Sequence, residues 1–262
     1  MNIDIGKTIR MSDFIDSKDG RSILVDTSIA SCVGATDGLE NLTEALTHMN
    51  ERVDGIIVNP GQAEHQAEHL GGKSRAAPIV RIDWTNGYRS DDFCLPVSHV
   101  KWLMISSGTD AVKIGASAVA ASLMLGFDDD FEANNIKDLS LRARECQTIS
   151  LPVIIDIRPI GEKVTENNYE ESITLGVSFM QELGADVLII PDCSPKTYRM
   201  IGDWISVPLL LRLDEIPPLK KVTGFFESGL AGIVLTEKIF MMTKLNEALQ
   251  KLELLIHAYR SG

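Results

Sequence analysis

The chain has 262 residues, 44% of them hydrophobic and 24% charged, which is enough apolar material for a large core. Its formal net charge of −12 excludes a nucleic-acid backbone or an anionic membrane as a partner, because both need clustered lysines and arginines. Residues 1–20 lack the apolar core of a signal peptide, and no later run approaches the roughly 20 apolar residues of a membrane span, so we expect a cytoplasmic protein.

A short apolar, β-branched run that ends in polar residues recurs along the chain and predicts the strands of a parallel sheet. Near-continuous runs of Ile, Val and Leu, instead of alternating ones, are typical of strands covered on both faces. About eight such strands predict a closed (β/α)8 TIM barrel, an α/β fold that typically takes about 250 residues. In chain order the predicted strands cover residues 22–26, 55–60, 78–83, 110–115, 152–158, 186–192, 208–215 and 232–238.

Amphipathic segments between these runs predict the helices of the barrel. The GATDG stretch after the first predicted strand is not a GxGxxG loop, which argues against the competing Rossmann-type open sheet. We therefore expect one domain over 1–262, in which 1–21 is an N-terminal extension leading into the first strand. The predicted helices cover 38–53, 131–148, 168–184, 194–205, 218–229 and 239–260.

Charged residues gather where the predicted strands end, and in a TIM barrel this edge carries the binding or catalytic residues. Side chains two apart in a strand share a face. One interpretation is an anion pocket, since inward guanidiniums bind phosphate or carboxylate groups, and the other is a network of salt bridges that neutralises the same arginines. The opposite-charge pairs are Arg81 with Asp83, Asp156 with Arg158, and Arg212 with Asp214.

Other residues near the predicted strand ends are weaker indications of a binding site. Trp84 follows the third predicted strand and would either stack on a ligand or anchor a long loop. The cysteines are widely spaced and have no paired histidines, so we expect no resident metal and no cofactor. Strand-end carboxylates leave Mg²⁺ as an alternative, because this ion prefers oxygen ligands. Those carboxylates are Asp26, Asp83, Asp192, Asp214 and Glu237.

Three stretches give the whole chain a resemblance to a known family: GKTIRMSDFIDSKDGRSILVD, GADVLII and SGLAGIVLTEKIF, at 6–26, 184–190 and 228–240. They are similar to the DeoC/FbaB-type class I aldolases, especially the archaeal-type fructose-bisphosphate aldolases and the tagatose-bisphosphate aldolases. The resemblance implies a small phosphorylated ligand, a Schiff base on a lysine, and cleavage or formation of a carbon–carbon bond. It also implies a homo-oligomer.

The chain departs from the family pattern at the positions that carry the chemistry. The resemblance places the Schiff-base lysine on the sixth strand, where this chain has Ile189. The first strand keeps an acid at Asp26 but not its neighbours. The phosphate-binding glycines after the last two strands are also replaced, by Arg212, Leu213 and Asp214 and by Thr236, Glu237 and Lys238.

Lys113, in the predicted fourth strand, is the best remaining candidate for the nucleophile, because the resemblance also places a lysine on this strand. A nucleophilic amine must lose its proton, and lowering its pKa from ~10.4 to ~7.5 costs about 4 kcal/mol. Asp156 and Asp26 would then act as general acid or base. The substrate would be bound by the residues Arg81, Asp83, Arg158, Arg212, Asp214, Lys238 and Trp84. The alternative is a buried ion pair of Lys113 with Asp83 or Asp156 and no chemistry.

Three hypotheses about function follow. The first is a divergent lyase of the aldolase type that acts on a small phosphorylated or carboxylated oxo compound, with Lys113 as nucleophile. The second is an inactive barrel that serves as a binding or assembly protein. The third is a metal-dependent enzyme that uses the carboxylates at the strand ends.

Overall fold

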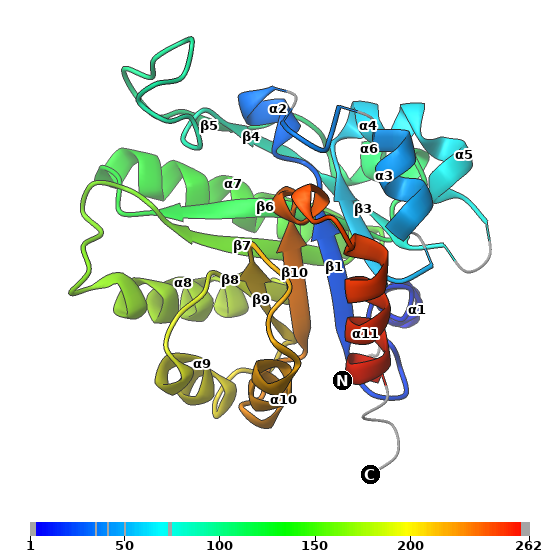
Figure 1. The fold of residues 1–262 in the computed structure, drawn as a ribbon. Helices are drawn as coiled ribbons and strands as arrows, with labels where there is room; N and C mark the ends of the chain where they lie inside the picture. The colour runs from blue at the N-terminus through cyan, green and yellow to red at the C-terminus, as the bar shows by residue number, and fades with distance from the viewer. Residues whose placement is uncertain (1–3, 35, 41, 50, 73–74, 258–262) are drawn as a thin grey trace.

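The computed structural model describes residues 4–257 apart from 35, 41, 50, 73 and 74. Its centre is a closed barrel of parallel strands in which the last strand pairs back onto the first, which confirms the predicted (β/α)8 fold (Figure 1). Around the barrel the strands follow in the order β1 (Ser22–Asp26), β2 (Gly55–Val58), β3 (Ala77–Arg81), β6 (Ala118–Leu125), β7 (Val153–Pro159), β8 (Val187–Ile190), β9 (Leu209–Leu213) and β10 (Gly232–Thr236).

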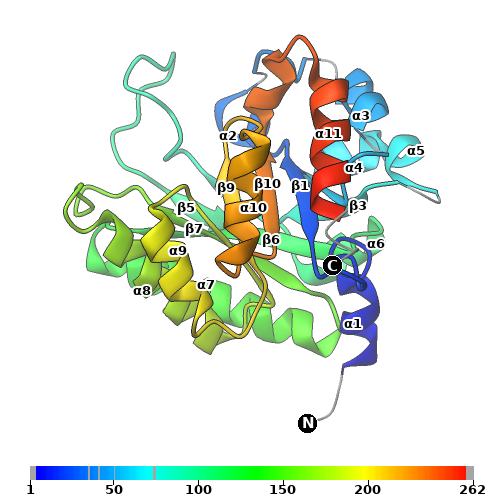
Figure 2. The same ribbon diagram turned by 60° about the horizontal axis from the view of Figure 1, so that its bottom comes forward.

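Helices cover the outside of the barrel, and Figure 2 shows α9, α10 and α11 outside the later strands. Before the fourth barrel strand the helices are short: α1 (Ile5–Met11), α2 (Ala30–Val33), α3 (Leu42–Met49), α4 (Pro60–His65), α5 (Ala67–Leu70) and α6 (Gly108–Lys113). After it they are α7 (Asp129–Thr148), α8 (Tyr169–Leu183), α9 (Pro195–Gly202), α10 (Leu219–Glu227), the 3₁₀ turn η1 (Glu237–Met241) and α11 (Leu245–His257). Residues 258–260 of the last predicted helix lie outside the described residues.

The fourth barrel strand is not the one that the sequence predicted. Residues 110–115 belong to α6 and the turn that ends it, and the strand is β6, which lies further along the chain. Ser107 caps α6, because its hydroxyl accepts a hydrogen bond from the backbone N–H of Asp110 at 3.1 Å. Gly115 ends the segment at a positive φ of 88°.

A separate small sheet lies near the C-terminal ends of the barrel strands. Its strands β4 (Asp83–Thr85) and β5 (Trp102–Met104) are antiparallel, with Trp84 opposite Leu103. Strand β4 begins one residue after the end of β3, and a long loop connects β4 to β5. This hairpin therefore holds the residues after β3 close to the strand ends.

The apolar core has an outer and an inner part. The outer part fills the space between strands and helices, and the inner part fills the barrel itself. Inner residues alternate along each strand with outer ones, as the pleat requires; on β7, Ile154 points inward while Ile155 packs outward. The inner cluster consists of Phe14, Leu24, Ile57, Ala77, Ile79, Ala118, Ala120, Ile154, Val187, Ile189, Leu210 and Val234.

The N-terminal segment closes the end of the barrel where the strands begin. Phe14 is fully buried and belongs to the inner cluster, and the hydroxyl of Ser22, at the start of β1, donates to its carbonyl at 2.6 Å. The segment before the first strand is thus part of the barrel core. Among the described residues, no helix is both long and apolar enough to cross a membrane.

Candidate active site

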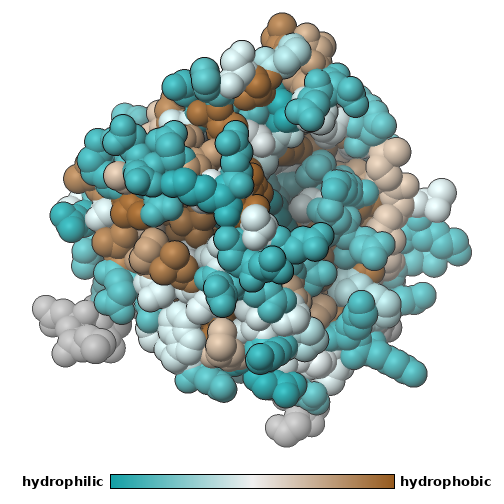
Figure 3. All heavy atoms as spheres, turned by 90° about the vertical axis from the view of Figure 1, so that its left-hand side faces the viewer, coloured by the Kyte–Doolittle hydropathy of each residue, from teal (hydrophilic) through white to brown (hydrophobic). Residues whose placement is uncertain are grey.

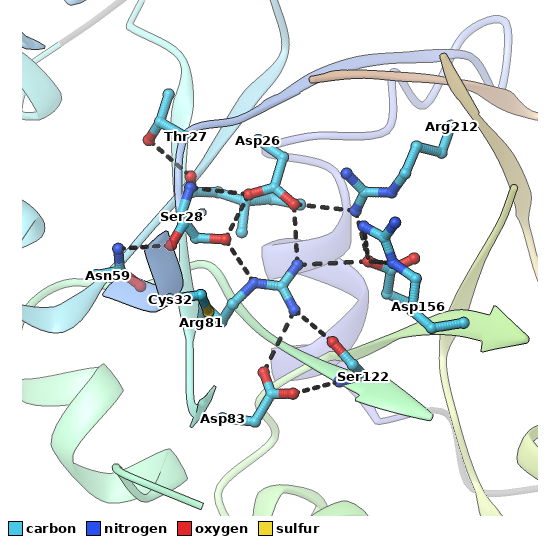
Figure 4. A network of polar contacts seen from close by, with 12 residues as sticks. Asp26, Thr27, Ser28, Cys32, Asn59, Arg81, Asp83, Ser122, Asp156 and Arg212 are labelled. Atoms are coloured by element: carbon cyan, nitrogen blue, oxygen red, sulfur yellow. Dashed lines mark hydrogen bonds and ion pairs between the residues drawn. The ribbon is translucent and has the colours of Figure 1, made fainter. Parts of the chain in front are cut away.

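A layer of charged side chains lies directly above the apolar interior of the barrel. Asp26 comes two residues after Leu24 of the inner cluster, and Arg81 two residues after Ile79. The same spacing holds on β7, where Asp156 comes two residues after Ile154, and on β9, where Arg212 comes two residues after Leu210. Because side chains two apart share a face of the strand, the four charges converge on the barrel axis at its C-terminal end (Figure 4).

Arg81 is the centre of this layer and makes four hydrogen bonds with its side chain. Its Nε donates to the Ser28 hydroxyl at 2.6 Å, and its Nη1 donates to Ser122 at 2.9 Å and to Asp83 at 3.3 Å. Its Nη2 contacts Asp26 at 2.9 Å and lies 3.6 Å from Asp156. With a relative exposure of 5%, Arg81 joins four elements, and four of its five N–H donors are engaged within the protein.

Asp156 is fully buried and takes its partners on one oxygen only. Its Oδ2 accepts from Arg212 Nη2 at 2.5 Å and from Arg158 Nε at 2.9 Å. Its Oδ1 has no hydrogen-bond partner among the described residues, and the same is true of the buried Nε of Arg212. Such buried, unpartnered polar atoms are rare, so this part of the layer has capacity left for a polar group.

The first-strand carboxylate is held ionised. Burial alone would raise the pKa of Asp26, but the guanidiniums of Arg81 and Arg212, together with the hydroxyl and backbone N–H of Ser28, hold it well below its usual range. Arg212 Nη2 contacts Asp26 at 2.9 Å as well as Asp156. Asp26 is therefore a fixed negative charge around neutral pH, and it binds arginines rather than exchanging protons.

Above this layer a cavity opens at the strand ends. It has a volume of about 190 Å³ and is bordered by Arg158, Arg212 and Glu237. A second cavity of about 780 Å³ between β8, β9, α9 and α10 shares Arg158 and Arg212 with it, and Asp214 borders both. The two hollows adjoin each other at these residues, and together they are called the mouth here; the larger one has room for a small molecule.

Lys113, the predicted nucleophile, does not lie at the mouth. It is at the end of α6, its side chain is 72% exposed, and it pairs with Asp110 at 3.5 Å one turn earlier. The helix runs toward the start of β6, so its last residue is at the opposite end of the barrel from the mouth. Neither the predicted chemistry nor the alternative ion pair with Asp83 or Asp156 is possible in this structure.

Ile189 lies on β8, directly opposite Asp156 of β7 and Leu210 of β9 in the strand register. It is fully buried in the inner cluster, below the charged layer. A lysine here would point at the carboxylates that Arg81 and Arg212 already bind. The carboxylate of Asp156, which is opposite Ile189 in the register, is already bound by arginines of other strands.

Two of the three predicted charge pairs form. Arg81 contacts Asp83, and Arg158 contacts Asp156, but Arg212 binds carboxylates of other strands. The predicted partner of Arg212, Asp214, instead binds Lys238. Arg158 keeps a fifth of its side chain exposed and packs over the ring of Tyr88 at 5.3 Å.

Asp83 and Trp84 lie behind the mouth. Asp83 is 2% exposed and accepts hydrogen bonds from the backbone of Ser122 and from the Trp102 indole, so it orients Arg81. The Trp84 indole donates to the carbonyl of Ser31 at 2.7 Å, and its residue does not border the mouth cavity. The loop-anchoring interpretation of Trp84 is the one that this geometry favours.

Sequence reasoning missed two serines that contact the charged layer. Ser28 and Ser122 orient the Arg81 guanidinium, and a serine after a strand carries no distinctive pattern. The Tyr88 hydroxyl borders the cavity, and burial raises its pKa. Burial also raises the pKa of Glu237, with a further contribution from the charge of Asp26. Only its place after the last strand marked Glu237 in advance.

Metal binding finds little support at the mouth. Among the described residues, the side chains grouped closely enough to hold an ion are Asp16, Asp19 and His257, near the start of β1 and the end of α11. At the mouth, Asp26, Asp83 and Asp156 are each bound by arginines. The hypothesis of a metal centre on the strand-end carboxylates is not favoured by this arrangement.

A further hollow lies on the outer surface, away from the charged layer. Helices α8 and α9 border a groove of about 760 Å³ that includes Leu175, Met200 and Trp204. Hydrophobic patches are visible among hydrophilic residues on the side of the molecule that carries these helices (Figure 3). No strand-end residue borders the groove, so it is separate from the candidate site.

Comparison with known proteins agrees with the barrel fold. A model of the DeoC/LacD family aldolases matches residues 22–189. The chain is 22% identical over 264 aligned residues to an uncharacterized aldolase of Saccharolobus solfataricus, covering 97% of this chain and 95% of that protein.

Solved structures give the same fold. The crystal structure of an archaeal fructose 1,6-bisphosphate aldolase superposes with a TM-score of 0.78 at 21% identity and covers 96% of this chain and 99% of its own. A second archaeal structure, with the catalytic Lys covalently bound to the carbinolamine intermediate of the substrate, gives a TM-score of 0.76 at 22% identity, covering 96% and 99%. At this identity the likeness concerns the fold alone.

Proposed function

Because the chain belongs to the DeoC/LacD aldolase family, we propose that it is an aldolase-type lyase that acts on a small carboxylated or phosphorylated oxo compound without an imine on a barrel lysine. The observation that carries the proposal is the mouth cavity, where two arginines face a carboxyl group whose pKa is raised. Cationic and proton-transfer groups thus meet at the edge of the barrel where aldolase chemistry takes place in this fold.

Arg158 and Arg212 supply the binding of the anion and of the developing negative charge. Arg158 uses Nε and Nη2 on a single oxygen of Asp156, so its remaining guanidinium nitrogen is available to a ligand. Arg212 makes its ion pairs through Nη2, and its Nε has no partner among the described residues. Arginines with unused donors bind carboxylate and phosphate groups in a fixed geometry.

Glu237 supplies the proton transfer. In the cleavage of a β-hydroxy carbonyl compound, its carboxylate takes the proton of the hydroxyl group. The carbon–carbon bond then breaks, the hydroxyl-bearing carbon becomes a new carbonyl, and the electron pair moves onto the original carbonyl oxygen as an enolate facing Arg212. The proton returns to the enolate carbon. A carboxyl group with a raised pKa suits both halves of this transfer, and the neutral Tyr88 hydroxyl is a donor in the same cavity.

Ligand binding is tested by calorimetric titration with pyruvate, glyoxylate and dihydroxyacetone phosphate. We expect at least one of them to bind the parent protein, and Arg158→Gln to weaken that binding about tenfold or more, since a charge-assisted contact is lost. Arg142→Gln removes an equal charge on α7, where Arg142 pairs with Glu145 far from the mouth, and should leave the affinity unchanged. Equal affinities in all three proteins would refute the arginine site.

Turnover is tested on a panel of carboxylated and phosphorylated β-hydroxy ketones, with products followed by mass spectrometry. Glu237→Gln should keep ligand binding and lose cleavage, because the amide cannot accept the hydroxyl proton. Reduction with borohydride during turnover should add no mass to any lysine. A trapped adduct on Lys238, which borders the cavity, would overturn the imine-free route.

A second candidate function is favoured by one specific observation. Ile189 occupies the sixth-strand position, and the charged layer above it has three arginines matched by three carboxylates. A barrel that binds the same class of compound without converting it would have this composition. Ligand binding that depends on Arg158, with no cleavage anywhere in the panel, would establish this second function.

A further inference from the structure

The end of the barrel between its last two strands contains a carboxylate with its own set of partners. β9 and β10 are parallel neighbours, with Leu213 opposite Leu235. Asp214 follows β9 directly, and its Oδ1 accepts a hydrogen bond from the Thr236 hydroxyl, at the end of β10, at 3.1 Å. Its Oδ2 binds the ammonium group of Lys238. The carboxylate is thus held by one hydroxyl and one cation.

This edge of a TIM barrel is commonly a phosphate site, formed by the loops after the seventh and eighth strands. A phosphate there needs hydrogen-bond donors and positive charge, and in this chain the donors at that edge are already engaged by Asp214. Glu237, on the same loop as Lys238, adds a second carboxyl group. An incoming phosphate would meet the negative charge of Asp214 and would compete with it for the Thr236 hydroxyl and the Lys238 ammonium group.

We propose that Asp214 acts as an internal anion that excludes phosphate from the β9–β10 edge, so that the ligand presents a hydroxyl or ammonium group there and its anionic group to Arg158 and Arg212. This specificity role rests on the proposed function, because it concerns the ligand of the same mouth. It narrows the ligand class to compounds with one anionic end and one hydrogen-bond-donating end.

The position of Asp214 fits this role. Its side chain is 58% exposed and borders both cavities of the mouth, so a ligand in either cavity meets it. Burial acts to raise its pKa, but the hydrogen bond and charge of Lys238 outweigh it and hold the pKa below its usual range. The group is therefore negative at neutral pH, and an isolated exposed pair of this kind contributes little to stability.

The test is calorimetric titration with inorganic phosphate. Asp214→Asn keeps the shape of the side chain, removes the charge and frees Lys238, so we expect it to bind phosphate at least about tenfold more tightly than the parent protein. Asp214→Glu retains the carboxylate and should match the parent. Glu227→Gln removes the same charge at the end of α10 from a side chain that borders neither cavity, and it should bind phosphate within about twofold of the parent.

A double variant locates the phosphate. Adding Lys238→Ala to Asp214→Asn should abolish the gain, because the freed ammonium group is the new partner. Equal phosphate affinity in the parent and in Asp214→Asn would refute the inference, as would a gain that survives Lys238→Ala. Failure of the proposed function alone would give a different result. The parent would bind none of the oxo compounds, while Asp214→Asn would still bind phosphate more tightly than the parent.

Discussion

Arg81 holds together three carboxylates that come from three strands. Asp26 is at the end of β1, Asp83 begins β4, and Asp156 lies on β7, and all three are nearly or fully buried. Each carboxylate would be costly to bury alone, since removing one partner of a buried ion pair leaves an uncompensated charge. The arginine is therefore a structural requirement of the mouth as well as part of its electrostatics.

Arg81→Ala should lower the free energy of unfolding by about 3–5 kcal/mol, the usual cost of breaking a buried ion pair. Urea denaturation followed by circular dichroism measures this change through the shift in the midpoint. Lys113→Ala is the matched control, because it also removes a cation with a carboxylate partner, but at an exposed position. Its midpoint should equal that of the parent, and a loss in Arg81→Ala no larger than in Lys113→Ala would contradict the central role of Arg81.

The charged residues at the mouth could be predicted from the sequence, but their pairing could be predicted only in part. Side chains two apart in extended chain share a face, which is why two pairs were predicted correctly: Asp156 with Arg158 on β7, and Arg81 with Asp83 where β3 passes into β4. Arg212 instead binds Asp26 and Asp156, which lie on other strands of the barrel. Distances across a closed barrel depend on the stagger of all its strands, and a single sequence does not contain them.

At the level of the element, the misplaced fourth strand has a physical reason. β6 reads AVAASLML, and its alanines have low strand propensity, so it lacks the β-branched signal of the other strands. The inward positions Ala118, Ala120 and Ser122 are small, and Arg81 lies beside them, since it is opposite Ala120 in the register and bonded to Ser122. Small residues here leave room for the guanidinium, which is a tertiary requirement invisible to a local pattern.

The capping signal at α6 was available in the sequence. Ser107 and Asp110 have the spacing of a capping box, with the Ser107 side chain accepting from the Asp110 backbone and donating to its carboxylate at 2.6 Å. Residues 110–115 were instead predicted as a strand, because the Val and Ile of DAVKIG favour strands. Capping at a serine three residues before an acid was the better guide to this segment.

Two loops at the C-terminal end of the barrel meet backbone to backbone. Gly126 follows β6 with a φ of 92°, and Gly161 follows β7 and donates to the carbonyl of Leu125 at 2.9 Å. A Cβ added to Gly161 would lie 2.1 Å from the backbone carbon of Gly126. Because neither backbone can move without breaking these contacts, the two loops are fixed relative to each other and to the charged layer below them.

Gly161→Ala should therefore destabilise the protein by about 1–3 kcal/mol, the range for forcing extra volume into a packed region. Gly224→Ala is the matched control: Gly224 lies inside α10, and a Cβ there meets nothing within 4 Å. The control should be more stable than the parent by about 1 kcal/mol, because alanine favours the helix interior. Denaturation midpoints of opposite sign confirm the contact, whereas a stabilised Gly161→Ala would contradict it.

At the scale of the molecule, the two ends of the barrel have different electrostatic designs. At the mouth, buried arginines form ion pairs with carboxylates. At the opposite end, a histidine contacts two carboxylates. His257 closes α11 and contacts Asp19, which precedes β1, and Asp54, which precedes β2, each at 3.1 Å. Asp54 also accepts from the backbone of Ile23 at 2.6 Å. The last described helix is thus fastened to the first two strands through one imidazole.

This fastening should make stability depend on pH. Burial would lower the pKa of His257, but its hydrogen bonds and charge interactions with Asp54 and Asp19 raise it to about 9. Because the pKa of the folded state lies above the ordinary value of about 6.5, the contribution is fully present below pH 6.5 and is lost as the pH rises through 9. A shift of this size corresponds to roughly 3 kcal/mol of stabilisation.

His257→Gln isolates the contribution, since glutamine keeps a hydrogen-bonding side chain but cannot carry the charge. Urea denaturation at pH 6, 7.5 and 9.5 gives the free energy of unfolding of both proteins. The parent should exceed the variant by roughly 3 kcal/mol at pH 6, by less at pH 7.5, and by little at pH 9.5. Other titrating groups act equally on both proteins, so only the difference reports His257. A difference that does not change with pH would show that the imidazole holds α11 as a neutral hydrogen-bonding group.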